Sequence, residues 1–203
     1  MSMPAEKPRR YTLDEYFKIA RDSEVKLEYV DRQIVAMAGG TYNHSLIAAN
    51  MVGELRNRLK GKPCQVLESN LRIGIRRAGR YTYPDIPVVC GQPEFDPKDD
   101  QTVTNPRLLI EVLSPTTELS DRGEKFTRYR MVDSLQEYVL VSQREPLVEC
   151  FFRQSDGGWL FMPYSGLNAI AKLRSLEIEI ALSEIYAGVT FPPPDEEQTP
   201  PPT

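Results

Sequence analysis

The sequence contains little of what builds a zinc site or a disulfide framework: its 203 residues include one histidine and three cysteines. With one histidine and no Cys-x-x-Cys motif, we expect no structural zinc site. Cys64, Cys90 and Cys150 are odd in number and scattered over apolar stretches. This distribution predicts reduced thiols in the core rather than disulfides.

Long apolar runs are also missing, and the first ten residues, MSMPAEKPRR, lack the apolar segment of a secretion signal. We therefore expect a cytoplasmic protein that does not engage a membrane. The sequence has neither a glycine-rich phosphate loop nor a Ser-His-Asp constellation, so we expect no organic cofactor.

An excess of positive charge is missing as well, because the formal net charge is −4. The last twelve residues, PPPDEEQTPPPT, hold three acids and no base. The rest of the chain contains 25 basic and 26 acidic residues. Such a nearly neutral domain can bind DNA only through a local patch. Four arginines around a predicted hairpin are the candidates, although an ordinary solvated turn explains them equally well: Arg72, Arg76, Arg77 and Arg80.

The length suits one domain with a sizeable core. We expect a flexible arm over residues 1–10, the domain over 11–191, and a disordered proline-rich acidic tail over 192–203.

Hydrophobic periodicity predicts an α/β domain. Helices are expected over 11–21, where Thr12 and Glu15 have capping-box spacing, and over 43–60, with a last helical turn over 182–186. Residues 26–30 and 33–38 are expected to form a hairpin, and residues 66–75 are expected to pair with 81–90. A meander is expected over 137–142, 147–153 and 159–164, and a single strand over 176–180.

Residues 108–113 form an apolar run with the length of a buried strand, yet Glu111 stands in its middle. Burying a carboxylate costs several kcal/mol unless it is paired, protonated or bound to a cation. From this residue alone, a structural ion pair and a metal ligand are equally well supported.

A helix is expected soon after this strand, which Ser114-Pro115 ends. Asp121 is its predicted N-cap, with Glu124 at the capping-box position. Lys125 then falls in the first turn, beyond the carboxyl end of the strand, where open α/β sheets usually place a ligand site. It could share that site with Glu111 or form an ordinary exposed pair with Asp121 at i, i+4.

Asp85 is a second acid at the head of a short apolar strand, and alone it could be a simple turn residue. The order Pro84-Asp85, Glu111, then a lysine resembles the PD-(D/E)XK nuclease superfamily. Within it, the succession PDIPVV, LLIEVLSPTT, DRGEKFTRY and EYVLV resembles the Uma2 family, a group linked to restriction endonucleases and also catalogued as a domain of unknown function. The likeness extends from residue 11 to about residue 189.

This resemblance implies a restriction-endonuclease-like core: a central mixed β-sheet flanked by helices, with an N-terminal hairpin and a C-terminal β-meander. It implies a metal-dependent endonuclease that hydrolyses DNA, in which Asp85 and Glu111 bind Mg²⁺ or Mn²⁺ and Lys125 orients water or stabilises negative charge. A homodimer follows by analogy with nucleases that cut both strands. A catalytically inactive protein that serves as a nucleic-acid-binding or structural module would retain the same residues.

The chain departs from the superfamily pattern at Leu113, where the lysine usually stands two residues after the second acid. In the Uma2 family the lysine lies on the following helix, which agrees with Lys125. The resemblance also implies an acid near Glu28 that faces the metal site and a histidine at His44 that faces the scissile phosphate. The residues alone favour a solvent-facing Glu28 and a hydrogen-bonded structural His44.

Overall fold

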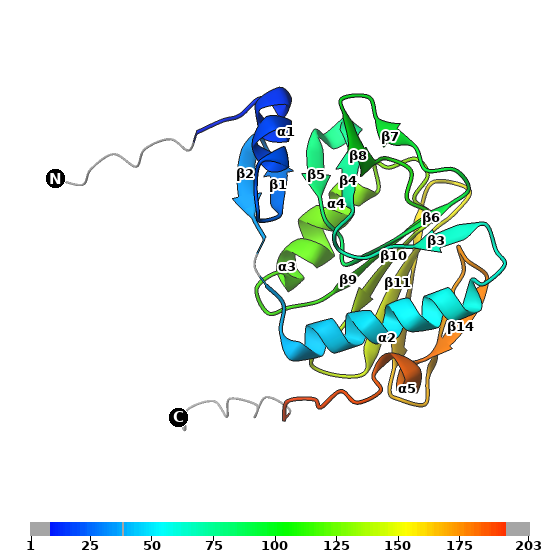
Figure 1. Ribbon diagram of the computed structural model, residues 1–203. Coiled ribbons are helices and arrows are strands. Elements are labelled where there is room, and N and C mark those ends of the chain that lie inside the picture. Colours follow the sequence, from blue (N-terminus) through cyan, green and yellow to red (C-terminus); the bar gives the residue numbers. More distant parts are fainter. Residues whose placement is uncertain (1–8, 38, 194–203) are drawn as a thin grey trace, which may run out of the picture.

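The computed structural model describes residues 9–37 and 39–193. Most of the expected arm, most of the expected acidic tail, and Ala38 at the end of a predicted strand lie outside these residues. Within them the chain forms two six-stranded mixed sheets and a two-stranded hairpin (Figure 1). The mixed α/β architecture is confirmed, but the strands are divided between two large sheets where one central sheet was expected.

The first sheet has the strand order β2-β1-β5-β4-β8-β7, and its only parallel pair among the described strands is β4 with β8. The predicted N-terminal hairpin forms its edge. The strands are β1 (Leu27–Val30), β2 (Gln33–Ala36), β4 (Arg72–Ile75), β5 (Arg80–Thr82), β7 (Phe95–Asp96) and β8 (Asp99–Val103).

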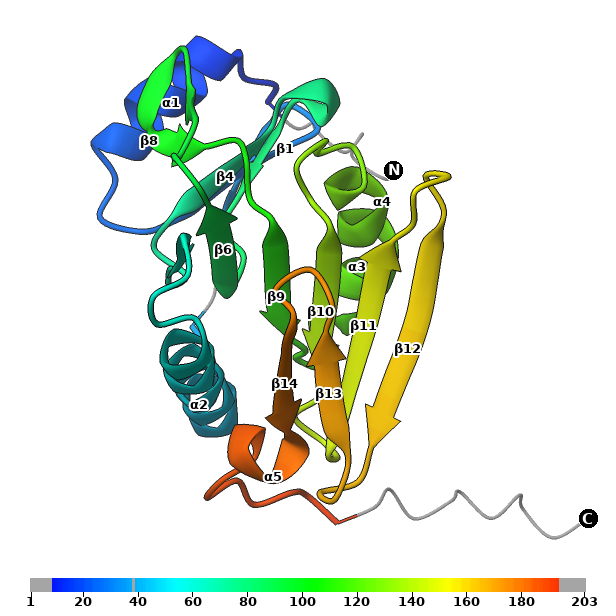
Figure 2. The same cartoon turned by 90° about the vertical axis from the view of Figure 1, so that its right-hand side faces the viewer.

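The second sheet has the order β12-β11-β10-β9-β6-β3, with β9 and β10 parallel. It contains the predicted buried strand as β9 and the predicted meander as β10 to β12, and Figure 2 shows the separate hairpin β13–β14 in front of it. The strands are β3 (Cys64–Val66), β6 (Ile86–Cys90), β9 (Leu108–Val112), β10 (Glu137–Val141), β11 (Leu147–Arg153), β12 (Trp159–Ser165), β13 (Ile170–Leu173) and β14 (Ile178–Ala181).

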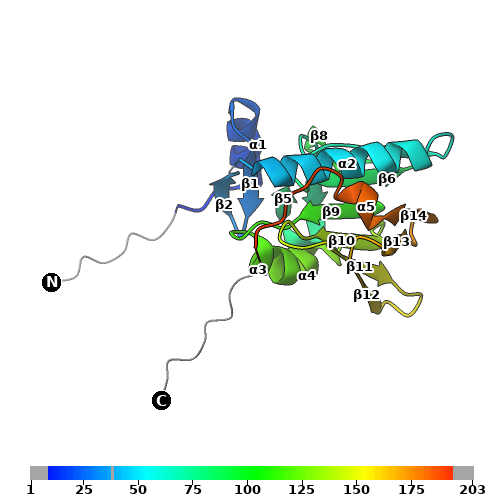
Figure 3. The same cartoon turned by 90° about the horizontal axis from the view of Figure 1, so that it is seen from below.

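Helices cover both faces of the second sheet, with α2 and α5 on one side and α3 and α4 on the other (Figure 3). The capping box of α1 is confirmed, since Thr12 and Glu15 exchange backbone-to-side-chain hydrogen bonds. Along the described residues, no helix is both long and apolar enough to span a membrane. The helices are α1 (Leu13–Arg21), α2 (Tyr42–Arg58), a 3₁₀ turn (Arg76–Ala78), α3 (Glu118–Ser120), a π-helical segment (Asp121–Lys125), α4 (Phe126–Tyr129) and α5 (Leu182–Ile185).

The predicted pairing of 66–75 with 81–90 is divided between the two sheets. β4 pairs with β5 in the first sheet, whereas β3 pairs with β6 in the second. The division falls at Tyr83-Pro84-Asp85, where proline cannot donate a ladder hydrogen bond. Asp85 consequently stands where the chain crosses from one sheet to the other.

The helix after β9 starts earlier than expected and widens in its middle. Helical structure begins at Glu118, so Asp121 is not an N-cap. Asp121 lies within the helical segment, and its side chain is buried in the protein. The segment from Asp121 to Lys125 is π-helical, a local widening that often occurs at functional sites.

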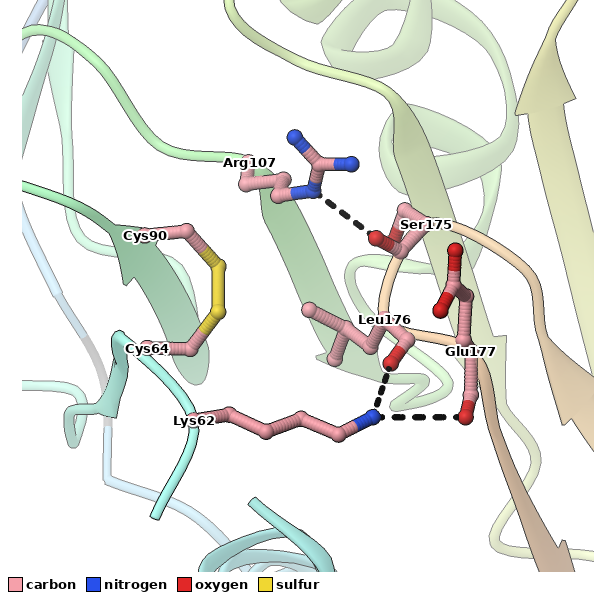
Figure 4. Close-up of a disulfide and its surroundings, with 7 residues drawn as sticks. All are labelled: Lys62, Cys64, Cys90, Arg107, Ser175, Leu176 and Glu177. Carbon is pink, nitrogen blue, oxygen red and sulfur yellow. Dashed lines mark hydrogen bonds between the residues drawn. A yellow bond between two sulfur atoms is a disulfide. The ribbon is translucent and has the colours of Figure 1, made fainter. Parts of the chain in front are cut away.

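The prediction of three reduced thiols was wrong for two of them, because Cys64 and Cys90 form a disulfide (Figure 4). They face each other directly in the ladder between β3 and β6, with Cα atoms 4.0 Å apart. Only Cys150 is free, and it is buried as expected. A spacing of 26 residues gives no sign of this cross-strand partnership.

Candidate active site

Glu111 lies near the end of β9 and is almost wholly buried. Its Oε1 accepts hydrogen bonds from the Tyr129 hydroxyl at 2.8 Å and the Lys125 ammonium at 3.2 Å. Among the described residues, no hydrogen bond engages Oε2. The buried acid therefore has a charged partner and retains one oxygen for another ligand.

Asp85 meets Glu111 across the antiparallel ladder of β6 and β9. Continuing the observed register by one residue places the two acids opposite each other. Asp85 Oδ2 accepts the Val112 N–H at 2.8 Å and lies 3.1 Å from His44 Nε2. Two acids far apart in sequence and the single histidine of the chain are thus brought together.

Lys125 reaches this cluster from the π-helical segment. Its Nζ lies 3.2 Å from Glu111 Oε1 and 2.8 Å from Asp121 Oδ1. The contact with Asp121 is an ion pair without hydrogen-bond geometry, and Asp121 is itself buried. Both partners considered for Lys125 from the sequence are therefore present, but the pair at i, i+4 is buried rather than solvated.

The surroundings of Glu111, Lys125 and His44 shift the pKa of each side chain. Burial raises the pKa of Glu111; Lys125 opposes this effect, while the charges of Asp85 and Asp121 add to it. Burial lowers the pKa of Lys125, but Glu111 and Asp121 outweigh burial and raise it, so the ammonium stays charged. The hydrogen bond to Asp85 raises the pKa of His44 against the opposing effect of burial.

A family model named Uma2, with the description "Putative restriction endonuclease", matches residues 13–183. The chain belongs to the Uma2 family. Two relatives from Synechocystis sp. carry the description "Uncharacterized protein": for slr1290 the identity is 38%, and the match covers 88% of this chain and 92% of the relative. The second, sll1609, is 31% identical over 82% of this chain and 94% of its own length.

The fold of this Uma2 chain is also similar to a crystal structure from Anabaena variabilis described as a "putative nuclease belonging to DUF820". The TM-score is 0.70, with 19% sequence identity, and the match covers 86% of this chain and 97% of the other. At that identity the likeness concerns the fold.

The donor set of this Uma2 chain fits a divalent cation. Asp85, Glu111 and Asp121 gather around Lys125, so three carboxyl groups share one ammonium. In the described ranges, no three or more His, Cys, Asp or Glu side chains form a ready-made metal cluster. Two carboxylates suffice for Mg²⁺, which commonly takes its remaining ligands from water and phosphate.

Glu28 is turned toward β5 rather than toward solvent. Its Oε1 accepts hydrogen bonds from the Thr82 hydroxyl and, at 3.3 Å, from the Tyr83 N–H. Its charge also contributes to the raised pKa of Lys125, so it lies within electrostatic reach of the cluster. Its two hydrogen bonds hold residues 82 and 83, which precede Asp85 in the chain.

The four arginines do not form one exposed patch, which corrects the grouping predicted from the sequence. Arg72 is only 4% exposed; its guanidinium lies over the rings of Tyr16, Phe17 and Tyr83. Arg80 is also buried and pairs with Glu124 at 2.7 Å. A side chain enclosed by protein cannot contact a DNA backbone.

Arg76 and Arg77 do remain at the surface. They line a pocket of about 630 Å³ together with Asn105, Met131 and neighbouring residues. Arg77 also pairs with Asp133 at 2.9 Å in an exposed position, which screens part of its charge. Of the four predicted arginines, only Arg76 and Arg77 are therefore exposed enough to contact a DNA backbone.

Two further residues support the site through contacts that were not predicted. Tyr129 follows Lys125 at i+4, so helical spacing could have indicated that its hydroxyl reaches Glu111. Gln143 could not have been found: its Nε2 donates to Leu113 O at 2.6 Å, and its Oε1 accepts from Thr41, the N-cap of α2, at 2.5 Å. These bonds tie the helix start that carries His44 to the end of β9.

Proposed function

We propose that this Uma2 chain is a metal-dependent endonuclease that hydrolyses phosphodiester bonds in DNA. The observation that carries the proposal is the convergence of Asp85, Glu111 and Lys125 in one buried cluster. Two carboxylates and an ammonium are the groups that phosphodiester hydrolysis requires, because the reacting phosphate is anionic and its leaving alkoxide is poor.

Each residue then has a defined task. Asp85 and Glu111 would hold Mg²⁺ or Mn²⁺ through oxygens that the hydrogen bonds of the described residues do not use. Such a cation, when bound, neutralises phosphate charge and lowers the pKa of water. Lys125, fixed by Asp121, presents a positive charge to the developing oxyanion. His44, hydrogen-bonded to Asp85, can hold or pass a proton near the phosphate.

A second candidate function is that of an inactive nucleic-acid-binding or structural module. The specific observation in its favour is that Lys125 already pairs with Glu111 and Asp121 without a metal. A descendant that had lost catalysis could keep this ion-pair network for stability alone.

Cleavage of supercoiled plasmid DNA separates the two candidates. We expect nicked product with Mg²⁺ or Mn²⁺, none with EDTA, and none from Glu111→Gln in the presence of metal. DNA binding without metal-dependent cleavage by the wild-type chain would instead support the inactive module. Cutting both strands calls for two sites, so a homodimer is part of the proposal, and sedimentation of the active protein tests it.

A further inference from the structure

The outer strands of the second sheet carry an aromatic strip, which we define as Phe151, Trp159 and Phe161. Phe151 pairs directly with Phe161 across β11 and β12, and Trp159 lies two residues before Phe161. All three side chains therefore project from the face that α4 covers further inward (Figure 3). Phe161 is 47% exposed, while Phe151 and Trp159 are half-buried.

The aromatic strip is held firmly by the core beneath it. Phe126 of α4 lies with its ring centroid 4.6 Å from Phe151 and 5.3 Å from Trp159. Phe126 in turn stacks on buried Tyr138 at 5.5 Å. The exposed ring of Phe161 lies 5.0 Å from Phe151. A ligand would thus meet rings whose positions are already set, which keeps the ordering cost of binding low.

Positive charge is interleaved with these rings. The guanidinium of Arg153 lies 4.9 Å from the centroid of Trp159, and that of Arg130 lies 5.5 Å from Phe126. Arg153 Nη2 donates to the carbonyls of residues 130 and 132, which fixes its position beside the aromatic strip.

Asp133, the acid whose charge acts on Arg153, pairs with Arg77, and the other acids close to the aromatic strip also have partners of their own. Glu149 lies on the same face of β11 but forms an ion pair with Arg122. Asp156, in the turn before β12, accepts the Gly158 N–H. Unlike the buried Arg72 with its ring neighbours, this combination of rings and guanidinium groups includes an exposed ring, that of Phe161.

We infer that the aromatic strip, with Arg130 and Arg153, is a stacking platform for a single-stranded stretch of nucleic acid. Bases stack on exposed aromatic rings with little dependence on sequence, and arginines beside the rings bind the phosphates. The inference deepens the proposed nuclease function and rests on it, because the bound stretch would be a flank of the DNA that the chain cuts. The platform is joined to the cluster around Glu111 through one helical segment, because Phe126, which contacts Phe151, directly follows Lys125 in the chain.

A second copy of the chain fits this surface less well. An isologous contact would place Arg130 and Arg153 near their own counterparts, which is repulsive, whereas a phosphate backbone neutralises them. Pro163 on the edge strand β12 has no N–H for pairing with another strand. These two features favour nucleic acid as the occupant.

Trp159 is the single tryptophan of the chain, so its fluorescence reports on the platform alone. The experiment titrates the full-length Glu111→Gln variant, in EDTA, with oligodeoxythymidylate of about 12 nucleotides, a length within known site sizes. We expect saturable quenching that weakens with salt. Phe161→Ala should lower the affinity about tenfold, and Phe161→Leu nearly as much, because stacking needs the ring.

Leu167→Ala is the matched control, because Leu167 is also 47% exposed and lies outside the aromatic strip; it should bind as the parent does. Absent quenching, or full affinity in Phe161→Ala or Phe161→Leu, would overturn the inference. A change of oligomeric state in Phe161→Ala would also overturn it, by assigning the surface to a second copy. The quenching assay needs no cleavage, so it tests the platform independently of the nuclease proposal. If the variant shows quenching but the wild-type chain does not cut DNA, only the nuclease proposal fails.

Discussion

Lys125 Nζ lies 3.2 Å from Glu111 Oε1, although the two residues are 14 positions apart and belong to different elements. The lysine approaches from a π-widened helix rather than from the strand that carries the acid. The strand position two residues after Glu111 is occupied by Leu113, which packs in the core that also contains Tyr129. The ammonium thus reaches the acid from a different backbone segment.

Replacing Lys125 by methionine should slow metal-dependent cleavage about a hundredfold or more, because the reacting phosphate loses its positive neighbour. It should also lower the metal-free stability by about 3 kcal/mol, since Asp121 remains buried without its cation. Single-turnover cleavage and urea denaturation measure the two effects. Lys172→Met, which removes an exposed pair with Glu179, is the control. A variant that cuts at the wild-type rate would leave Lys125 with a structural role alone.

Adding Leu113→Lys to Lys125→Ala should restore part of the lost cleavage rate. Residues 111 and 113 share strand parity, so the new ammonium would point to the face that Glu111 occupies. The core must tolerate the loss of a buried leucine, which the melting temperature of the double variant reports. A well-folded double variant with no recovery would show that the ammonium must approach from the helix.

Glu111 should make metal-free stability depend on pH. Its pKa is raised in the folded protein, so unfolding releases its proton as pH rises from about 4.5 through the raised value, and stability is lost over that interval. The loss should approach about 1.4 kcal/mol per pH unit, and Glu111→Gln should abolish this component. Urea denaturation in EDTA at several pH values gives the comparison. Parallel pH profiles for the two proteins would contradict the assignment.

The double change Arg76→Ala with Arg77→Ala should weaken binding to unrelated DNA duplexes. If each guanidinium neutralises one phosphate, the slope of log affinity against log salt should become shallower by about 2. Electrophoretic mobility shifts at several salt concentrations measure it. Lys172→Ala removes an exposed charge elsewhere and should leave the slope unchanged. An unaltered slope in the arginine variant would mark these residues as an ordinary solvated turn.

Reduction of the bond between Cys64 and Cys90 should destabilise the protein. The bond closes a loop across 26 residues, so its loss should lower the free energy of unfolding by about 2–4 kcal/mol. Denaturation with and without a thiol reductant measures the difference. The double variant Cys64→Ser with Cys90→Ser should be indifferent to the reductant. An equal response of both proteins would show that the effect does not pass through this bond.

The sequence by itself determined the local elements whose causes lie within a few residues. The capping box at Thr12 and Glu15, the apolar strand around Glu111 and the three strands of the meander all form as their patterns predict. Such signals depend on backbone capping and side-chain periodicity, which neighbouring residues set without help from the rest of the chain.

Only the tertiary structure decided how these elements meet. Asp85 faces Glu111 because the chain crosses between two sheets, and Cys64 bonds Cys90 because β3 pairs with β6 instead of continuing into β4. Arg72 was grouped with surface arginines but lies in an aromatic enclosure built by α1 and the segment before Asp85. The physical reason is common to these cases. Burial and strand pairing depend on residues that are distant in sequence, so the local pattern of apolar and polar residues does not indicate which distant surface an element will cover.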